Sequence, residues 1–311
     1  MRFSELEKPR VAILGAGREG RAVWRQLRKR YPGKPLALFS ESSFEESFVQ
    51  MTDSGIDHLY PGAFDVVALE DYDVLVRSAG ISPYRAELRE LGAKGVRFTT
   101  ASNIWFAENP NARTICISGT LGKSTTASLT AHLLRQSGLD VCLAGNIGRP
   151  MLDVDESPDW WVIELSSYQL SDLNAKVEVA VLLNLSEEHI DWHGGLQRYH
   201  SDKLKLARLA CDGHVIANHA DEILLGALED DEAVTWFNHT GGWSADRNSV
   251  FRNHGGPAGQ AEREAEKTSG LPMRLAAPPA LPGQHNMHNL AAALTIMELL
   301  GLDQSLSLIH I

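Results

Sequence analysis

The chain has 311 residues, 43% hydrophobic and 22% charged, a composition that excludes wholesale disorder and suffices for about two domains. With 29 Lys and Arg against 40 Asp and Glu, the net charge is −11, which argues against general nucleic-acid binding. The three cysteines, Cys116, Cys142 and Cys211, form no CxxC pair, so neither a disulfide framework nor a structural zinc site is expected. No apolar run reaches the ~18 residues of a membrane span, and the N-terminus has no apolar signal core, so we expect a cytoplasmic protein that does not enter a membrane.

Short apolar runs alternate with helical stretches along the first part of the chain. Strands are predicted at residues 11–14, 36–39 and 74–76, and a helix is predicted at residues 18–30. This βαβ order predicts a parallel sheet with helices on both faces. The turn-rich residues 109–112 mark a boundary, so the first predicted domain spans residues 1–110.

A second series of the same kind follows, and it predicts a second domain over residues 111–301. Its helices are predicted at residues 124–137 and, at the end of the domain, up to Leu299 and Leu300. The polar stretch 255–270, rich in Gly and Glu, is expected to be an exposed loop. The predicted strands are residues 114–117, 141–143, 161–163, 179–183 and 214–217.

A glycine-rich turn, Gly15-Ala16-Gly17-Arg18-Glu19-Gly20, follows the first predicted strand. Such a turn lets the backbone approach a phosphate at a helix N-terminus. Glu41 follows the second strand, where dinucleotide enzymes keep an acid for the ribose. The pattern alone leaves three alternatives open: NAD(P), another nucleotide diphosphate, or a purely structural turn.

The stretch from Ser118 to Thr126 has the composition and the strand-to-helix context of a phosphate-binding loop. Lys123 can reach the outer phosphates of ATP, and Ser124 or Thr125 can hold Mg²⁺. The usual GxxxxGK[ST] pattern requires glycine where Ile117 stands, so this is a variant loop.

Three further groups of polar residues stand at strand or helix ends. Glu164 ends a predicted strand, where it could hold Mg²⁺ or be an ordinary strand-end acid. His189 follows another strand and could be a Mg²⁺ ligand, a general base or an ordinary surface or core histidine. Its spacing to His193 fits no strong zinc motif. Asn286 and Asn289 lie at a helix start, where both could face one ligand or one could cap the helix.

Taken together, these motifs resemble the Mur ligase family, and within it the MurD type, which adds glutamate. The family patterns G-T-x-G-K-[ST]-T, E-[LV]-S-S-[FY]-Q-L and N-x-[ST]-[EP]-[DE]-H-x-D match residues 119–125, 164–170 and 184–191. The patterns G-N-I-G and G-x-H-N-x-x-N match residues 145–148 and 283–289, and residues 78–81 resemble S-P-G-I. The motifs occur in family order and span nearly the whole chain.

The resemblance implies an α/β fold with mostly parallel sheets. Residues 1–110 would form a Rossmann-like UDP-substrate domain and residues 111–301 a P-loop-type ATP-binding domain. The family's third domain binds the amino acid, and residues 302–311 would be the stub where it begins. We therefore expect these residues alone to be inactive in the complete reaction.

The resemblance also implies an activity and its partners. The family makes an amide in peptidoglycan precursor synthesis: ATP phosphorylates a substrate carboxylate, and an amine attacks the acyl phosphate. For this chain the substrates would be UDP-N-acetylmuramoyl-L-alanine, ATP and glutamate, with the D-isomer favoured and the L-isomer open. We expect a monomer that binds neither nucleic acid nor membrane. The alternatives are an NAD(P)-dependent oxidoreductase and an inactive UDP-sugar- and ATP-binding fragment.

Residue roles carry over from the matched motifs. The stretch Tyr199-x-x-x-Lys203 resembles the one that carries the family's carbamylated lysine, which would be Lys203. Lys205 is the alternative candidate for that lysine. The pair Arg18-Glu19 departs from the usual sequence of the glycine turn, although Arg18 could pair with a phosphate.

The implied catalytic residues are Lys123, Glu164, His189 and Lys203. The implied ATP-binding residues are Gly119, Thr120, Leu121, Gly122, Lys123, Ser124, Thr125, Asn286 and Asn289. The implied UDP-substrate residues are Gly17, Arg18, Ser78, Gly80, Asn146 and His189. The implied Mg²⁺ ligands are Ser124, Glu164, His189 and, if carbamylated, Lys203.

Overall fold

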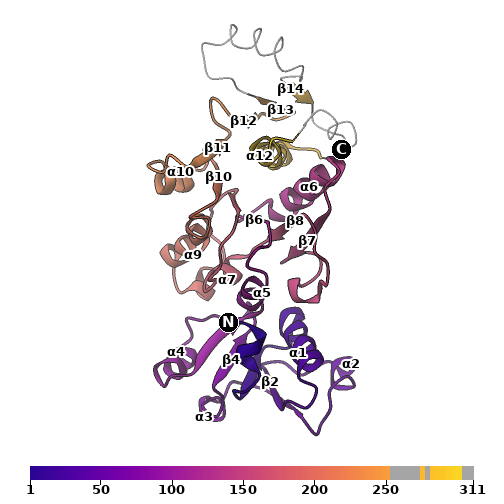
Figure 1. Cartoon of the computed structure of the whole chain (residues 1–311). Helices are drawn as coiled ribbons and strands as arrows, with labels where there is room; N and C mark the ends of the chain where they lie inside the picture. The colour runs from indigo at the N-terminus through magenta and orange to yellow at the C-terminus, as the bar shows by residue number, and fades with distance from the viewer. Residues whose placement is uncertain (253–273, 277–280, 303–311) are drawn as a thin grey trace.

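The structure, a computed structural model, describes residues 1–252, 274–276 and 281–302. Two parallel sheets follow one another along the molecule, and a small antiparallel sheet lies beyond the second (Figure 1). We refer to the part built on the first sheet as the first unit and to the part built on the second sheet as the second unit. The loop predicted at residues 255–270 lies outside the described residues, as do residues 303–311 of the predicted stub.

The first sheet is entirely parallel, with strand order β3-β2-β1-β4-β5. Its strands are β1 (Val11–Leu14), β2 (Leu36–Ser40), β3 (Asp57–Pro61), β4 (Val74–Arg77) and β5 (Arg97–Thr100). Its helices are α1 (Arg18–Arg30), α2 (Glu46–Val49), α3 (Val66–Leu69), α4 (Ala86–Ala93) and α5 (Ala101–Glu108), with a short 3₁₀ helix, η1 (Phe3–Leu6), before β1. The predicted inward side chains Ala22, Val23 and Leu27 of α1 are buried. Chain order reverses between β1 and β4, and open α/β sheets bind ligands at such a point.

The second sheet is also parallel, with strand order β11-β10-β9-β6-β8-β7. Its strands are β6 (Thr114–Ser118), β7 (Val141–Gly145), β8 (Trp160–Glu164), β9 (Val179–Leu182), β10 (His214–Asn218) and β11 (Val234–Phe237). Its helices are α6 (Lys123–Gln136), α7 (Ser167–Leu170), α8 (Ile190–His193), α9 (Leu196–Leu209), α10 (Glu222–Leu228) and α12 (Gln284–Leu299), with the 3₁₀ helix η2 (Met151–Asp153). The reversal point here lies at β6, between β8 and β9, so the loop after β6 is again where a ligand is expected.

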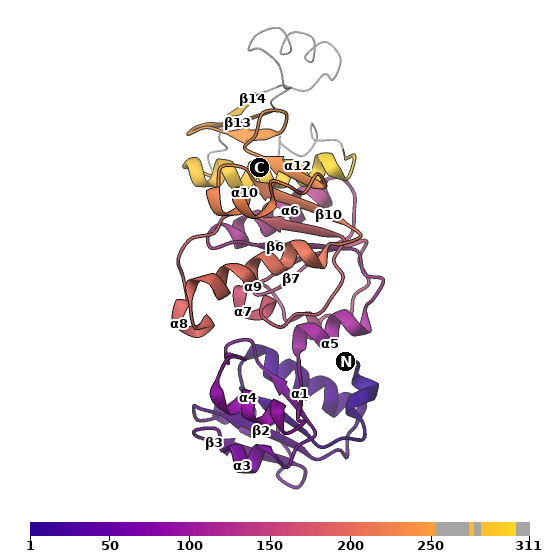
Figure 2. The ribbon, with the colours of Figure 1, turned by 90° about the vertical axis from the view of Figure 1, so that its left-hand side faces the viewer.

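Helices cover both faces of the second sheet, as Figure 2 shows for α9 on one side and α6 and α12 on the other. Alternate residues of β6 enter different cores. Ile115 and Ile117 pack in the cluster that contains α6 and α12, whereas Cys116 packs with α9 residues such as Leu206. A strand buried on both faces carries the continuous apolar run from which it was predicted.

The antiparallel sheet was not predicted from the sequence. It consists of β12 (Trp243–Ala245), β13 (Ser249–Arg252) and β14 (Arg274–Ala276), in that order. Its strands β12 and β13 pack on α12 and cover part of that helix. No helix among the described residues is long and apolar enough to span a membrane.

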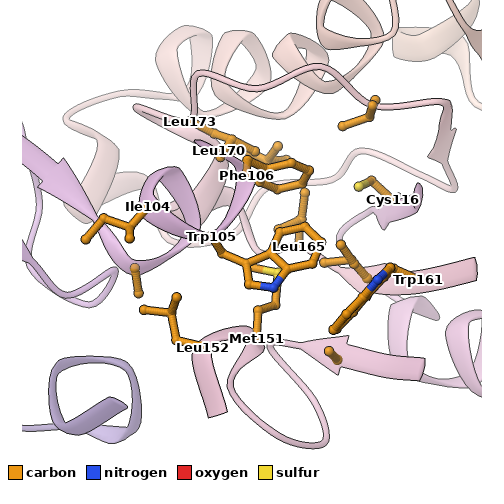
Figure 3. Packing of buried hydrophobic residues seen from close by; sticks show 14 of the residues in the cluster. Ile104, Trp105, Phe106, Cys116, Met151, Leu152, Trp161, Leu165, Leu170 and Leu173 are labelled. Atoms are coloured by element: carbon orange, nitrogen blue, oxygen red, sulfur yellow. The ribbon is translucent and has the colours of Figure 1, made fainter. Parts of the chain in front are cut away.

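The two units share a hydrophobic core. Helix α5 lies between them in both views, and its Trp105 packs edge-on against Trp161 of β8 with ring centroids 4.7 Å apart (Figures 1–3). Leu165 and Met151 of the second unit surround the same indole (Figure 3). The turn at residues 109–112, where we predict the domain boundary, therefore joins units that are packed together.

Candidate nucleotide and UDP-substrate site

The loop between β6 and α6 is held in shape by glycines. Gly122 has φ +82°, and a Cβ there would collide with the Asn289 side chain of α12. A Cβ on Gly119 would lie 2.9 Å from Leu183 Cβ, beyond the end of β9. Because the loop is enclosed between α12 and the end of β9, only glycine fits at these two positions. Asn289, predicted as an ATP-binding residue, thus touches the phosphate loop directly. Asn286, by contrast, donates from Nδ2 to the Pro282 carbonyl at 2.8 Å, and its Oδ1 lies 3.5 Å from Asn289 Nδ2.

The first turn of α6 has the geometry of an anion-binding site. Its backbone N–H groups at Lys123, Ser124 and Thr125 have no partners within the helix, as in any helix first turn, and they point along the positive end of the helix dipole. Lys123 Nζ donates to the Thr120 carbonyl at 2.7 Å, folded over the same turn. This arrangement can hold the phosphates of a nucleotide.

Asn184 is a residue whose role the sequence did not indicate. It follows β9, and its Oδ1 accepts from the N–H groups of Thr120 at 3.1 Å and Leu121 at 2.8 Å. Its Nδ2 returns a bond to the Leu121 carbonyl at 2.9 Å. These contacts occupy the backbone N–H groups of Thr120 and Leu121, two of the predicted ATP-binding residues, so a phosphate would meet free N–H groups only from the first turn of α6 onward. The one available signal was that Asn184 opens the motif that contains His189.

Glu164 connects the loop to the wall of a cavity. Its carboxylate is almost fully buried at the end of β8, and Oε2 accepts from Ser124 Oγ at 2.8 Å. Oε1 accepts from Asn146 Nδ2, also at 2.8 Å. A carboxylate beside a hydroxyl is the donor set that Mg²⁺ prefers, so these residues fit the cation predicted for the site. Among the described residues, there is no cluster of three or more His, Cys, Asp or Glu that could hold a metal ion. Glu164 and Ser124 would supply only part of the coordination of Mg²⁺.

Lys203 of α9, and not its rival Lys205, faces the loop. Its Nζ donates to the Gly119 carbonyl at 2.7 Å, whereas Lys205 Nζ lies 3.3 Å from the Ser171 carbonyl. Lys203 is 2% exposed. Burial, and next the positive charge of Lys123, lower the pKa of the Lys203 amine to about 7, while Glu188 and Glu164 oppose the shift. At neutral pH much of this lysine is therefore an uncharged, nucleophilic amine.

His189 lies at the same edge of the sheet but is more exposed to solvent than Lys203. It caps α8 with φ +54°, a conformation that side chains other than glycine rarely adopt and that recurs at functional sites. Its ring lies 4.9 Å from that of Tyr168, and its side chain is 46% exposed. Glu188 Oε2 lies 3.6 Å from His189 Nε2.

A cavity of about 850 Å³ lies between the two units. The predicted UDP-substrate residues Gly17, Arg18, Ser78, Gly80 and Asn146 all line it, and Tyr168 lines it from the second unit. His189, the sixth predicted residue, is not among the lining residues, but its ring contacts Tyr168, which is one of them. The structure thus brings the glycine turn and the motif at residues 145–148 to one space.

The glycines of the turn at residues 15–20 have different structural roles. A Cβ on Gly20 would collide with the Gly15 carbonyl, and one on Gly15, at φ +93°, would lie 2.8 Å from Ser78 Oγ. A Cβ on Gly17 would meet nothing within 4 Å. Gly15 and Gly20 are therefore needed for the turn itself, while Gly17 leaves open the space in which a ligand can approach the backbone.

The charged residues around the turn are already engaged. Arg18 donates to the Gly148 carbonyl of the second unit. Glu19 accepts from the Ala79 N–H at 3.1 Å and from Gln169 Nε2 at 2.7 Å. Glu41 lines the cavity, but Arg85 Nη1 lies 2.8 Å from its Oε1. An acid held in this ion pair is a weaker acceptor for a ribose than the free acid that the NAD(P) alternative requires.

A phosphate loop at the reversal point of one parallel sheet and a glycine turn at that of another define an α/β protein with two candidate nucleotide sites. A family model described as the Mur ligase middle domain matches residues 117–297. The chain belongs to the Mur ligase family, which confirms the resemblance and the predicted α/β fold.

Named relatives agree with this assignment. The chain is 40% identical, over 97% of its length, to a UDP-N-acetylmuramoyl-L-alanine--L-glutamate ligase of Xanthomonas euvesicatoria. It is 37% and 35% identical to proteins of the same name from Xylella fastidiosa and a Micromonospora species. The chain spans 63% of the length of the Xanthomonas relative.

Solved structures share the fold. The ligase acting on UDP-N-acetylmuramate and L-alanyl-gamma-D-glutamyl-meso-diaminopimelate from Neisseria meningitides matches 97% of this chain and 96% of its own, with a TM-score of 0.61 at 22% identity. The UDP-N-acetylmuramate-alanine ligase MurC from Thermotoga maritima matches 97% of this chain and 67% of its own, with a TM-score of 0.54 at 18% identity.

Proposed function

We propose that this chain binds UDP-N-acetylmuramoyl-L-alanine and ATP for an ATP-dependent ligase that adds glutamate in peptidoglycan precursor synthesis. The observation that carries the proposal is the hydrogen-bonded chain from Asn146 through Glu164 to Ser124. It joins the wall of the large cavity to the phosphate loop, so a substrate in the cavity and a nucleotide on the loop would meet at Glu164. The relatives' shared name supports the substrate and the ligase activity.

In the proposed reaction, an oxygen of the alanyl carboxylate attacks the γ-phosphorus of ATP, and ADP leaves. The glutamate amine then attacks the carbonyl carbon of the acyl phosphate, and phosphate leaves with loss of a proton from nitrogen. Phosphoryl transfer needs alignment and charge neutralisation more than covalent help from the protein. Lys123 and the first turn of α6 would hold the phosphates, and Asn146 would orient the carboxylate. Asn289, and Asn286 beside it, would meet the nucleotide.

Mg²⁺ would be held by Ser124 and Glu164, with His189 at the open side of the edge, and when bound it would neutralise charge on the transferred phosphoryl group. Lys203 would add a further oxygen ligand as a carbamate. Its amine nitrogen would bond to the carbon of CO₂ and lose a proton. The amine pKa of about 7 supports this step, because only the uncharged amine has the lone pair it requires.

The amino acid would be L-glutamate. From the motifs alone the D-isomer was favoured and the L-isomer left open, but the relatives named above carry L-glutamate in their names. We also propose that the protein acts as a monomer in the cytoplasm, where nucleotide-linked precursors and ATP are available. The oxidoreductase alternative leaves the Asn146–Glu164–Ser124 chain without a role.

Calorimetric titration tests the proposal. We expect Mg·ATP to bind the chain, and UDP-N-acetylmuramoyl-L-alanine to bind both alone and together with it, whereas NAD and NADP do not bind. Asn146→Ala should weaken binding of the UDP-substrate and spare that of Mg·ATP. Phosphate release with each glutamate isomer then tests the amino acid. Binding of NADP in place of the UDP-substrate would favour the oxidoreductase instead.

A further inference from the structure

A hydrogen-bonded network, buried except for the half-buried Tyr84, lies where the two units meet. Tyr84 Oη of the first unit lies 2.7 and 2.8 Å from the two carboxylate oxygens of Asp202, on α9. Asp202 Oδ2 also lies 2.6 Å from His193 Nδ1, and His193 Nε2 lies 3.0 Å from Ser167 Oγ. None of the residues identified above as binding nucleotide or substrate belongs to this network.

The chemistry of the groups fixes where the protons are. A carboxylate only accepts, so both Tyr84 Oη and His193 Nδ1 must donate to Asp202. Burial lowers the pKa of His193, and in the neutral ring Nε2 is an acceptor to which the Ser167 hydroxyl donates. Each side-chain polar atom in the network has a partner, as buried polar groups require.

The order Ser167–His193–Asp202 has the connectivity of a nucleophilic triad, but it cannot act as one. Ser167 is 3% exposed and His193 is 0% exposed, so no substrate carbonyl can reach the serine oxygen. The network must act through the elements it joins.

It joins the first unit to the helix that lies against the phosphate loop. On α9, Tyr199 Oη lies 2.8 Å from Thr120 Oγ1 and Lys203 Nζ lies 2.7 Å from the Gly119 carbonyl. Asp202 immediately precedes Lys203, and successive residues of a helix point about 100° apart. Asp202 therefore fixes the rotation of α9 from one side while Lys203 contacts the loop on another.

The first-unit end of the network borders the large cavity. Tyr84 follows the loop at residues 78–81, which lines that cavity. Trp192, next to His193, donates from its indole to the Gly80 carbonyl at 2.8 Å, and Ser82 Oγ donates to the Trp192 carbonyl at 2.7 Å. The same few residues thus touch the cavity loop and the helix of Lys203.

We propose that Asp202 is a positioning residue: by holding Tyr84 and His193 it sets the rotation of α9, and with it the placement of Lys203 on the phosphate loop. The ligands involved rest on the proposed function, but the positioning itself does not. Loss of the Tyr84 hydroxyl should therefore loosen a loop that Tyr84 does not touch.

Hydrogen exchange on the free chain tests the positioning without any ligand. Tyr84→Phe removes one donor and keeps the ring, which lies 4.6 Å from the Arg198 guanidinium. We expect amide exchange to accelerate about fivefold in α9 and in residues 119–125, the scale of one buried hydrogen bond. Tyr31→Phe is the matched control, because it removes a 3.0 Å hydroxyl bond to the Phe3 carbonyl within the first unit. Equal exchange in α9 for the two variants would overturn the proposal.

Two substitutions at Asp202 separate positioning from simple packing. In Asp202→Asn the amide can donate to His193 Nδ1, so the ring proton moves to Nε2 and donates to Ser167, while Tyr84 still finds an acceptor. We expect nitrogen NMR to show this tautomer change, with Mg·ATP affinity within twofold of wild type. Asp202→Leu keeps the branching at Cγ but leaves His193 and Tyr84 unpaired, and we expect Mg·ATP affinity to fall at least fivefold. Equal affinities for the two variants would contradict the proposal. If the wild-type chain bound no Mg·ATP, the proposed function would fail, and hydrogen exchange would still decide the role of Asp202.

Discussion

Replacing the buried Lys203 with methionine should stabilise the fold while removing the amine from the phosphate loop. The side chain is almost fully buried, and its amine pKa falls from the usual 10.5 to about 7. At 1.36 kcal/mol per pH unit, that difference corresponds to a cost of about 5 kcal/mol for carrying the charge into the folded state. Methionine carries no charge and has a comparable unbranched shape.

The expected gain is smaller than this cost. At pH 7 about half of the folded-state lysine is already neutral, and methionine loses the 2.7 Å hydrogen bond to the Gly119 carbonyl, which offsets about 1 kcal/mol. We therefore expect Lys203→Met to raise the free energy of unfolding by about 3 kcal/mol at pH 7.

The pH dependence gives the sharper test. Between pH 7 and 10.5 the unfolded lysine holds a proton that the folded one has lost, so wild-type stability rises with pH across this window. Below pH 7 both states are protonated and the penalty is constant. The advantage of Lys203→Met should therefore be largest at and below pH 7 and vanish near pH 10.

Urea unfolding from pH 6 to pH 10, in buffers depleted of carbon dioxide, measures this difference. Lys176→Met is the matched control, because Lys176 is exposed, in a 2.7 Å ion pair with Asp212, and should show no such pH trend. Added bicarbonate should stabilise wild type and not Lys203→Met if the carbamate forms. A stability difference that is independent of pH would refute the low pKa assigned to the Lys203 amine.

Three more predictions follow from the geometry. Lys123→Ala should weaken Mg·ATP binding at least tenfold in calorimetry with an unchanged melting temperature, since Lys123 is only half-buried and its amine bonds to a loop carbonyl; equal affinity would remove Lys123 from the site. Gly17→Ala should lower affinity for the UDP-substrate and leave stability unchanged, whereas Gly20→Ala should cost about 2 kcal/mol in urea unfolding because its Cβ meets the Gly15 carbonyl. Trp105→Ala, which empties the core shared by the two units, should cost about 3–5 kcal/mol in the same assay, and a small loss would show that the units are stable apart.

The strands that could be predicted from the sequence were those buried on both faces. The run at residues 11–14 and the run at residues 179–183 are apolar throughout, as central strands of a parallel sheet must be. In the two parallel sheets, the strands missed were edge strands of mixed composition, such as β3 (Asp57–Pro61), where every residue but Asp57 is at least partly exposed. A half-exposed edge strand carries no apolar run, so periodicity does not reveal it.

In the candidate site, too, some residues could be predicted from local sequence patterns and others could not. Lys123 and Glu164 were predicted because each stands beside a strand end in a local pattern. The loop contacts of Asn184 and the partnership of Asp202 with Tyr84 were not, because each joins residues far apart in sequence. The first pairing depends on how the second sheet is ordered and the second on how the two units pack, and a single sequence holds no local sign of either.

A crystal structure of the chain with UDP-N-acetylmuramoyl-L-alanine and a non-hydrolysable ATP analogue tests the central claim most directly. The uridine diphosphate should lie in the cavity against Gly17, with the triphosphate on the first turn of α6. The alanyl carboxylate should lie beside Asn146, within reach of the γ-phosphate. A UDP-substrate bound outside the cavity, or a carboxylate turned away from the γ-phosphate, would contradict the proposed function.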